Sequence, residues 1–158
     1  MDEEQFQLLY EATARPVHSY LLAMTGRKDV ADDLLQEVYF RFFQRHFTEE
    51  ALTDKRRYLF RIATNLLRDR WRRRKEEQWP TTLDFGRSYD LDARIDVRRM
   101  LESLKPRDGE LLWLAYIEGM NHAEIALITG LGEPSIRPLL FHARRKAAGL
   151  LRLSKEIP

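Results

Sequence analysis

The segment from Asp54 to Lys75 places the strongest constraint on how this 158-residue chain can fold. Its apolar residues recur at the spacing that forms one stripe along a helix, and Asp54 stands where it can cap the N-terminus. The sequence therefore predicts a long helix with one side docked on a core and a cationic opposite side. The stripe comprises Tyr58, Leu59, Ile62, Ala63, Leu66 and Leu67, and the polar side comprises Arg57, Arg61, Thr64, Asn65, Arg68 and Arg72.

The charge of this helix favours contact with a polyanion. Between Lys55 and Lys75 the only acidic residue is Asp69. A surface that serves solubility alone usually mixes both signs, whereas a nucleic-acid backbone is bound by clustered cations. Trp71 and Tyr58 are available to stack on bases. The alternative is a solvated helix whose arginines only keep the chain soluble, which is what charge runs commonly are.

Composition narrows the class of protein. Hydrophobic residues make up 44% of the chain, enough for real cores, and the net charge of +2 is unevenly distributed. Residues 68–75 hold six basic residues and one acid, whereas residues 76–96 hold six acids and two arginines. The absence of cysteine excludes disulfides and thiolate zinc sites. No apolar run approaches the roughly 20 residues that span a membrane, and the N-terminus lacks a signal-peptide pattern, so we expect a cytoplasmic protein.

Periodicity in the first half predicts two further helices. The first runs from Asp2 to Thr25, and Pro16 should kink or split it because proline removes a backbone donor. The second, capped by Asp29, runs to about Phe43 with Ala31, Leu34, Leu35, Val38 and Phe42 buried. We expect these two helices and the cationic helix to pack as one all-α domain.

The second half begins with a stretch that is rich in turn residues and acids, which is typical of a linker. Helical pattern resumes near Leu91, a new element begins at Lys105-Pro106, and Gly119 ends it. Asn121 and Glu124 form a plausible capping pair for a short helix, residues 123–129, that Gly130 ends. A basic amphipathic helix follows the turn. This is a helix-turn-helix pattern, and the spacing equally fits an ordinary helical hairpin.

The two halves together resemble bacterial RNA polymerase sigma factors of the extracytoplasmic-function group. Three stretches carry the resemblance: residues 31–45, YLFRIATNLLRDRWRRR from Tyr58, and the C-terminal stretch from Leu104 to Leu151. They follow the family's order over nearly the whole chain. The resemblance implies an all-α protein of two small helical domains, with sigma region 2 at residues 1–76, a flexible linker at 77–92 and sigma region 4 at 93–158.

The resemblance also implies a polymerase-binding face. Asp33, Gln36 and Glu37 share one side of a helix, and two carboxylates with an amide suit arginine forks. A family member docks this side, extended here by Phe40, on the clamp of the beta-prime subunit of core RNA polymerase. The competing interpretation is a solvent-facing acidic patch.

In the family the cationic helix melts and holds the −10 element of promoter DNA. Asn65 matches a near-invariant asparagine of the family, and where most members have tryptophan this chain has Tyr58, which we expect to pack. The acidic linker threads into the polymerase in the family, although a plain tether explains its acids equally well. The residues that the resemblance assigns to the −10 element are Lys55, Arg56, Arg57, Arg61, Asn65, Arg68 and Arg72.

The helix-turn-helix half corresponds to the module that reads the −35 element, and it departs from the family pattern at Pro138 and Leu139. Proline inside a helix costs about 3 kcal/mol, a cost that vanishes if the helix starts near Ser135 and Pro138 lies in its first turn. We therefore expect weaker or altered −35 recognition. The candidate groove residues are Glu133, Ser135 and Arg137, with Arg144 and Arg145 on the DNA backbone.

Other functions fit the sequence less well. The four histidines lack metal-ligand spacing and no nucleotide loop or nucleophile motif occurs, so we expect neither an enzyme nor a cofactor. A stand-alone helix-turn-helix regulator would leave the acidic face around Glu37 unexplained. A sigma-like polymerase adaptor with weakened −35 recognition is kept open by Pro138. Family members of this size are usually held inactive by an anti-sigma protein, so the resemblance also implies such a partner.

Overall fold

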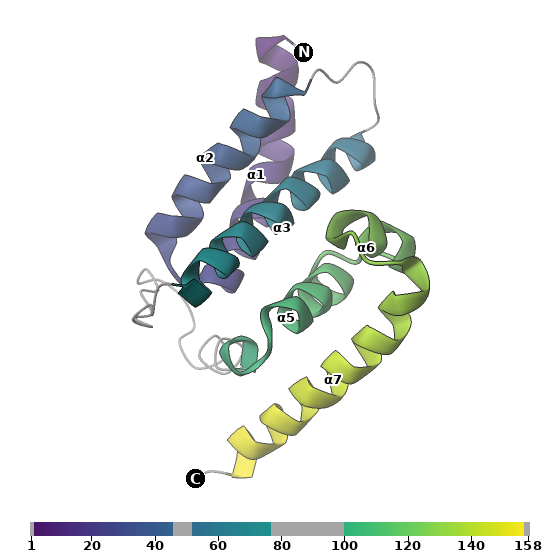
Figure 1. Ribbon diagram of the computed structural model, residues 1–158. Coiled ribbons are helices and arrows are strands. Elements are labelled where there is room, and N and C mark those ends of the chain that lie inside the picture. Colours follow the sequence, from purple (N-terminus) through teal and green to yellow (C-terminus); the bar gives the residue numbers. More distant parts are fainter. Residues whose placement is uncertain (1, 46–51, 77–99, 157–158) are drawn as a thin grey trace. The chain divides into compact units, whose positions relative to one another are not determined.

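The computed structural model describes residues 2–45, 52–76 and 100–156, with side chains described as far as residue 74 in the second range and 150 in the third. Helices dominate these residues and no strand occurs among them, which confirms the all-α class (Figure 1). The elements are α1 (Glu3–Thr25), α2 (Lys28–Gln44), α3 (Leu52–Glu76), α5 (Pro106–Leu112), the π-helical segment η1 (Trp113–Ile117), α6 (His122–Thr129) and α7 (Glu133–Glu156).

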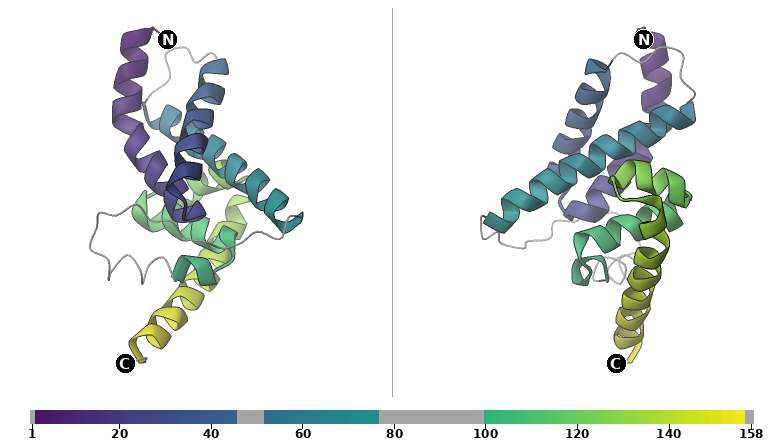
Figure 2. Two further views of the ribbon diagram at one scale, coloured as in Figure 1. Left: turned by 90° about the vertical axis from the view of Figure 1, so that its left-hand side faces the viewer. Right: turned by 45° about the vertical axis from the view of Figure 1, so that its right-hand side comes forward.

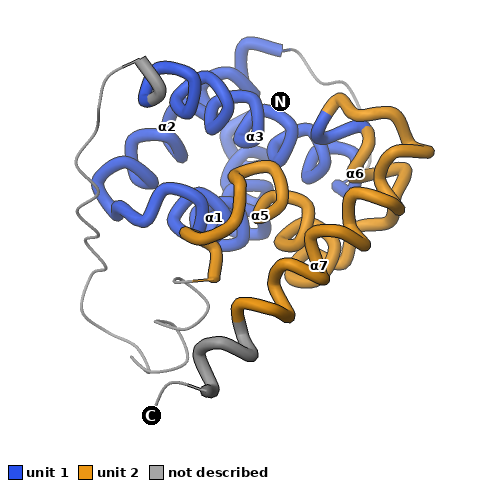
Figure 3. The backbone as a smooth tube through the Cα atoms, turned by 60° about the horizontal axis from the view of Figure 1, so that its bottom comes forward, with its two compact units in different colours: residues 1–84, 127–129 blue, residues 85–126, 130–158 orange. Residues whose placement is uncertain are grey.

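The chain divides into two compact units (Figure 3). Residues 1–84 and 127–129 form the first, and residues 85–126 and 130–158 form the second. The predicted linker, residues 77–92, lies outside the described residues, so the domain limits drawn from the sequence stay predictions. Within the described ranges no helix is long and apolar enough to cross a membrane.

The first unit is a bundle in which α1, α2 and α3 contact one another pairwise, with α3 lying across the other two (Figure 2). Apolar side chains from all three helices fill its centre because each helix carries one apolar stripe. Hydroxyl pairs join the helices within this core: Tyr20 with Thr64 at 2.9 Å, and Thr13 with Tyr39 at 2.5 Å. The largest fully buried residues are Val17, Tyr20, Leu21, Val38, Phe42, Leu59 and Phe60.

The ends of α1 follow from local chemistry. Asp2 and Gln5 form a reciprocal capping box, in which Asp2 Oδ1 accepts from the Gln5 backbone N–H at 2.8 Å. Gly26 ends the helix with a φ of 70°, a left-handed conformation that glycine adopts without strain. Pro16 does not split α1, which runs unbroken through it.

The two aspartates expected to cap α2 and α3 lie inside the first turns instead. Arg27 occupies the cap position of α2, and Asp29 accepts from Arg27 Nη2 at 2.9 Å. Desolvation opposes ionisation of Asp29, but hydrogen bonds from the Val30 backbone and from Arg27 outweigh it and lower the pKa of Asp29. Asp54 is the third residue of α3 and pairs with Arg57. A carboxylate in the first turn still favours the helix through its dipole.

The second unit packs α5 against α7. Lys105 and Pro106 begin α5 as the sequence predicts, with the proline at the first turn. The chain then widens into η1, in which the Glu118 backbone N–H donates to the Trp113 carbonyl at 3.1 Å. A partly buried ion pair, Lys146 Nζ to Asp108 Oδ2 at 3.2 Å, joins α7 to α5. The buried apolar residues of this unit include Leu111, Leu114, Ile125, Ile136 and Leu140.

Candidate nucleic-acid interfaces

One exposed side of α2 carries the four residues predicted to bind a basic partner. Asp33, Gln36, Glu37 and Phe40 follow one another at three- and four-residue spacing, so they share a side of the helix. The Phe40 side chain is 59% exposed, large for a phenylalanine. Glu37 Oε1 accepts from Arg41 Nε at 2.9 Å, an i,i+4 surface pair of the kind that contributes only about 0.3–0.5 kcal/mol. The Glu37 carboxylate can therefore exchange this arginine for one from a partner.

The neighbouring helix α3 carries a stripe of opposite charge. Arg61, Asn65 and Arg72 are exposed and Arg68 is half-buried, and their spacing places all four on one side of the helix. Burial of Leu59, Ile62, Ala63, Leu66 and Leu67 on the opposite side fixes the orientation of this stripe.

Thr64, which the sequence pattern places on the polar side of α3, is instead fully buried. Its hydroxyl has a partner in Tyr20 Oη at 2.9 Å, so burial leaves it hydrogen-bonded. Thr64 is thus part of the core and does not belong to the cationic stripe.

The entrance of α3 holds three further cationic residues, Lys55, Arg56 and Arg57, all half-buried. The Arg56 guanidinium lies 5.6 Å from the centre of the Phe60 ring, and Arg57 pairs with Asp54. These contacts hold the two guanidinium groups close to the helix surface. Lys55 is placed beside them at the same end of α3.

The two aromatic residues of α3 differ in environment. Tyr58 is half-buried under the Arg45 guanidinium, 4.3 Å from its ring centre, and lies 6.1 Å from the Phe42 ring. This agrees with the expectation that Tyr58 packs. Trp71 is 43% exposed on the last turns of α3, where its ring is available to stack on a base.

Arg70 and Arg74 on the last turns of α3 and Arg27 at the N-cap of α2 form a cationic cluster. Burial, followed by repulsion from Arg74 and Arg27, lowers the pKa of Arg70. The cluster therefore joins the C-terminal turns of α3 to the turn between α1 and α2. It extends the positive charge of α3 beyond the Arg61–Arg72 stripe.

In the second unit, α6, a three-residue turn and α7 form the predicted helix-turn-helix. Asn121 and Glu124 make the predicted capping box, with Asn121 Oδ1 accepting from the Glu124 backbone at 2.9 Å. Gly130 ends α6 at a φ of 76°. The candidate base-reading residues Glu133, Ser135 and Arg137 are all exposed at the start of α7.

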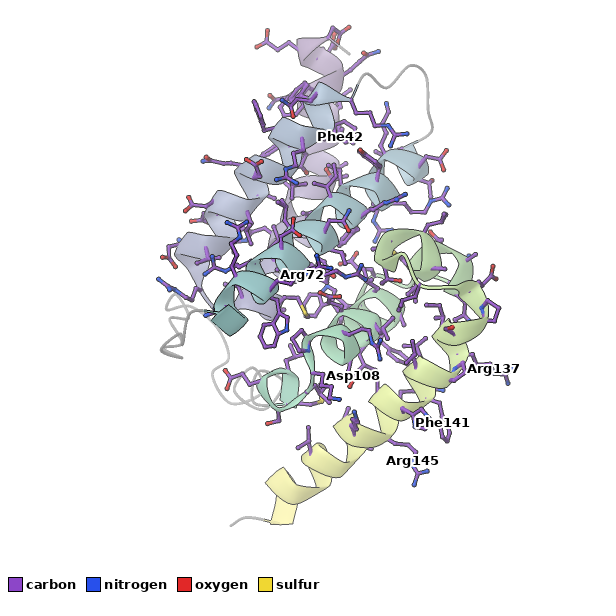
Figure 4. The ribbon with its side chains drawn as sticks, in the orientation of Figure 1. Phe42, Arg72, Asp108, Arg137, Phe141 and Arg145 are labelled. Atoms are coloured by element: carbon purple, nitrogen blue, oxygen red, sulfur yellow. The ribbon has the colours of Figure 1, made fainter. Side chains whose placement is uncertain are left out.

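The backbone candidates lie further along α7. Arg144 and Arg145 are exposed; Arg145 lies 5.8 Å from the centre of the Phe141 ring, and Arg144 Nη1 donates to Tyr116 Oη at 2.8 Å. Figure 4 shows Arg137, Phe141 and Arg145 following one another along the side of α7 turned away from α5. Tyr116 was not among the sequence candidates because its contact spans 28 residues, beyond the reach of any local pattern.

Pro138 lies inside α7 and not in its first turn. The helix begins at Glu133, two residues earlier than the start near Ser135 that would have accommodated the proline. Pro138 therefore removes a hydrogen bond from the helix interior, while its own ring is exposed. Leu139 is half-buried, so it contributes partly to the core.

Comparison with known proteins identifies the family. A model described as Sigma-70 region 2 matches residues 9–77, and one described as Sigma-70, region 4 matches residues 94–146. The extracytoplasmic-function (ECF) RNA polymerase sigma factor SigM of Bacillus subtilis is 26% identical over 151 residues, covering 90% of this chain and 92% of SigM. The chain belongs to the ECF group of the sigma-70 family. Sigma factors are non-enzymatic transcription initiation factors.

Other relatives of this sigma factor agree. The ECF sigma factor SigX of B. subtilis is 35% identical over 74 residues, covering 47% of this chain and 38% of SigX. Two solved structures share its fold. The sigma factor RpoE of Bartonella quintana, in complex with the anti-sigma factor NepR, has a TM-score of 0.74 at 19% identity, covering 94% of this chain and 98% of RpoE. CnrH, in complex with the cytosolic domain of CnrY, has a TM-score of 0.70 at 23% identity, covering 96% of this chain and 90% of CnrH.

Proposed function

We propose that this sigma factor binds core RNA polymerase through α2, holds the opened −10 element with α3, and reads the −35 element with α7. One observation carries the proposal. Two adjacent helices of a single bundle expose faces of opposite charge, the α2 face of Asp33, Gln36, Glu37 and Phe40 and the α3 stripe of Arg61 to Arg72. Such a bundle can bind a basic protein surface and an anionic nucleic acid at the same time.

The α2 face is suited to a basic coiled coil. Two carboxylates and an amide accept the parallel N–H groups of arginine, which binds carboxylates in bidentate fashion. Phe40 adds an exposed aromatic ring to the same side, and aromatic anchors at the centre of an interface dominate its binding energy. The partner on core polymerase would be the clamp of the beta-prime subunit.

The α3 stripe is suited to single-stranded DNA. Opening a duplex costs base stacking, so a protein favours the open form only by binding exposed bases and phosphates better than it binds the duplex. Arg61, Arg68 and Arg72 supply phosphate contacts, and the exposed Asn65 amide can both donate to and accept from a base edge. Lys55, Arg56 and Arg57 extend the track to the entrance of the helix.

The start of α7 is suited to the major groove of the −35 element. Arg137 is exposed and its fork matches the O6 and N7 atoms of guanine. Glu133 and Ser135 precede it on the same exposed turns, and Arg144 and Arg145 follow as phosphate contacts. Because the structural neighbour RpoE of Bartonella quintana is a sigma factor in complex with the anti-sigma factor NepR, we also propose an anti-sigma protein as a partner.

Pull-down with core polymerase tests the α2 assignment. Charge reversal by Glu37→Lys or Asp33→Lys should abolish association, whereas Glu11→Lys, which reverses an exposed carboxylate on α1, should leave it intact. Retention of core by both α2 variants would overturn the assignment. Reconstitution of the wild-type chain with core, followed by mapping of transcription starts, then tests promoter-directed initiation.

A second function is favoured by the position of Pro138. A proline in the interior of α7 disturbs the helix that would enter the groove. On this alternative the chain binds polymerase but contributes little −35 recognition. Run-off transcription from a mapped promoter and from the same promoter with a scrambled −35 element separates the two. Equal transcript yields support the adaptor, and a strong loss supports −35 recognition.

A further inference from the structure

Tyr116 and Arg144 form a pair of exposed hydrogen-bond donors on the second unit. Tyr116 lies in η1 with its side chain 56% exposed, and Arg144 lies on α7. Arg144 Nη1 donates to Tyr116 Oη at 2.8 Å. The contact joins the π-helical turn to α7 across 28 residues of sequence.

Once the hydrogen bond between them is formed, both side chains still carry hydrogen-bond donors that this bond does not use. Arginine has five N–H groups and no acceptor, so the tyrosine oxygen must accept. The tyrosine O–H hydrogen is then directed elsewhere, as are the remaining N–H groups of Arg144. Within the described part of the chain Arg144 forms no ion pair, whereas Lys146, two residues on, is paired with Asp108. The Tyr116–Arg144 pair therefore presents a neutral and a charged donor side by side without a carboxylate of its own.

The pair lies in line with the proposed groove residues. Arg144 follows Arg137 by seven residues, about two turns, which returns it to the same side of α7 about 10 Å further along the axis. In a DNA duplex, the groups that lie about this far from a contacted base are the phosphates that line the groove. The π-helical turn that carries Tyr116 is a rare conformation, found frequently at functional sites.

We propose that Tyr116 and Arg144 together bind one phosphate of the −35 duplex, Tyr116 donating its O–H and Arg144 its N–H. The tyrosine oxygen also positions the Arg144 guanidinium. The ligand is a phosphodiester of double-stranded DNA, so the pair contributes affinity without sequence preference. This inference rests on the proposed −35 role of α7 and adds Tyr116 to it.

Titration of promoter fragments with the reconstituted holoenzyme, repeated over a range of salt concentrations, tests the pair. Tyr116→Phe deletes only the hydroxyl and should weaken binding about fivefold to twentyfold, because the lost hydrogen bond has a charged acceptor and water replaces part of it. The ranking of −35 sequences should not change. Arg144→Gln should lower the slope of log K against log salt by about 0.9, the value for one phosphate contact.

The double variants decide whether the two residues share a phosphate. In an Arg144→Gln background the effect of Tyr116→Phe should fall below about twofold, because coupled groups are not additive. In the matched Arg145→Gln background it should keep its full size, because the Arg145 guanidinium lies over the Phe141 ring. Any of three results would overturn the proposed shared phosphate contact. These are an unchanged affinity of Tyr116→Phe, an effect of Tyr116→Phe that is equally large in both backgrounds, and an altered preference among −35 sequences.

Two controls distinguish loss of the phosphate contact from misfolding of the variants and from failure of the role proposed for α7. Thermal unfolding should show Tyr116→Phe folded, since the lost bond is at the surface, and Arg144→Lys should keep the salt slope because it keeps the cation. If the wild-type holoenzyme itself fails to bind any −35 duplex, the proposed role of α7 fails and the pair with it. If the wild type binds and the Tyr116 variant is indistinguishable from it, only the pair fails.

Discussion

Two tyrosine hydroxyls buried in the first unit act as links between its helices. Tyr20 on α1 bonds Thr64 on α3, and Tyr39 on α2 bonds Thr13 on α1. A buried hydroxyl without a partner costs about 1–3 kcal/mol, so each pair is favourable only in the native register of the helices. These links help to hold the exposed faces of α2 and α3 in a fixed relation.

The buried phenol of Tyr39 makes stability sensitive to alkaline pH. Desolvation raises the pKa of Tyr39 to about 12, with Thr13 opposing the shift and Tyr10 adding to it. The folded chain therefore holds this proton more tightly than the unfolded chain, whose value is 10.0. The resulting stability is complete below pH 10 and is lost as pH rises toward about 12.

Denaturant unfolding at pH 9 and pH 11 checks this effect. Tyr39→Phe should be less stable than wild type at pH 9, because it lacks the bond to Thr13, but should lose about 1 kcal/mol less between the two pH values. The exposed Tyr10→Phe should decline slightly less than the wild type, because it removes only the small part of the Tyr39 pKa shift that Tyr10 adds. Parallel curves for wild type and Tyr39→Phe would contradict the assigned role.

Residue pairs such as these are what sequence patterns miss. Helical periodicity placed Thr64 on the polar side of α3, since it cannot show that Tyr20, 44 residues away, satisfies the hydroxyl in the core. The hydrogen bond between Arg144 and Tyr116 was not predicted for the same reason. By contrast, Asp33, Gln36 and Glu37 were placed on one side of a helix correctly, because their relation depends only on spacing within that helix.

At the scale of the element, α7 combines a strong amphipathic pattern with an interior proline. Pro138 is the sixth residue of the helix, so the carbonyl of Pro134 loses its helical donor. Burial of Ile136, Leu140, Ala143 and Ala147 offsets this cost by holding the helix on the core of the second unit.

Replacing that proline should stabilise α7. Pro138→Ala restores a backbone donor and removes a ring clash, and the amides of the first turns of α7 should gain up to about 3 kcal/mol of protection from hydrogen exchange. The matched variant Pro134→Ala should give no gain, since proline is tolerated in the first turn of a helix. Equal exchange rates in Pro138→Ala and wild type would show that the helix already relaxes around the ring.

Capping by Asn121 gives a second test at this scale. Asn121→Ala removes the side-chain acceptor of the Glu124 N–H and should cost about 1 kcal/mol of stability in the second unit, measured by denaturant unfolding. Glu124→Gln, which preserves an acceptor for the Asn121 N–H, should cost much less. A similar loss in both variants would assign the effect to Glu124 charge and not to the capping box.

Helix boundaries were predictable where a single local signal decided them. Asn121, Gly130 and Lys105-Pro106 marked boundaries of α6 and α5 correctly, because caps and turns depend on a few neighbouring residues. The prediction that Asp29 and Asp54 cap their helices was wrong. An aspartate is favourable both at the cap and in the first turn, where it interacts with the helix dipole, so its presence does not fix the boundary. The functions proposed for the two faces come from the family pattern and not from periodicity.

Negative and positive side chains gather on different surfaces of the molecule, although the net charge is only +2. The acidic face of α2 and the cationic stripe of α3 belong to one bundle whose core is shared, so a surface substitution on either face leaves the other in place. On the proposed function this separation divides initiation into two steps. Core binding needs α2, and opening of the promoter needs α3.

Variants of the two faces should therefore fail at different steps. The double variant Arg61→Gln with Asn65→Ala should bind core polymerase as the wild type does but leave promoter thymines unreactive to permanganate, which modifies only unpaired bases. Glu37→Lys should fail at core binding, and the thymines should be unreactive for that reason. Because the contacts proposed for the stripe are to phosphates, raising the salt concentration should reproduce the α3 defect in the wild type before it dissociates the holoenzyme. Loss of core binding in the α3 variant, or normal opening by it, would contradict the division of roles.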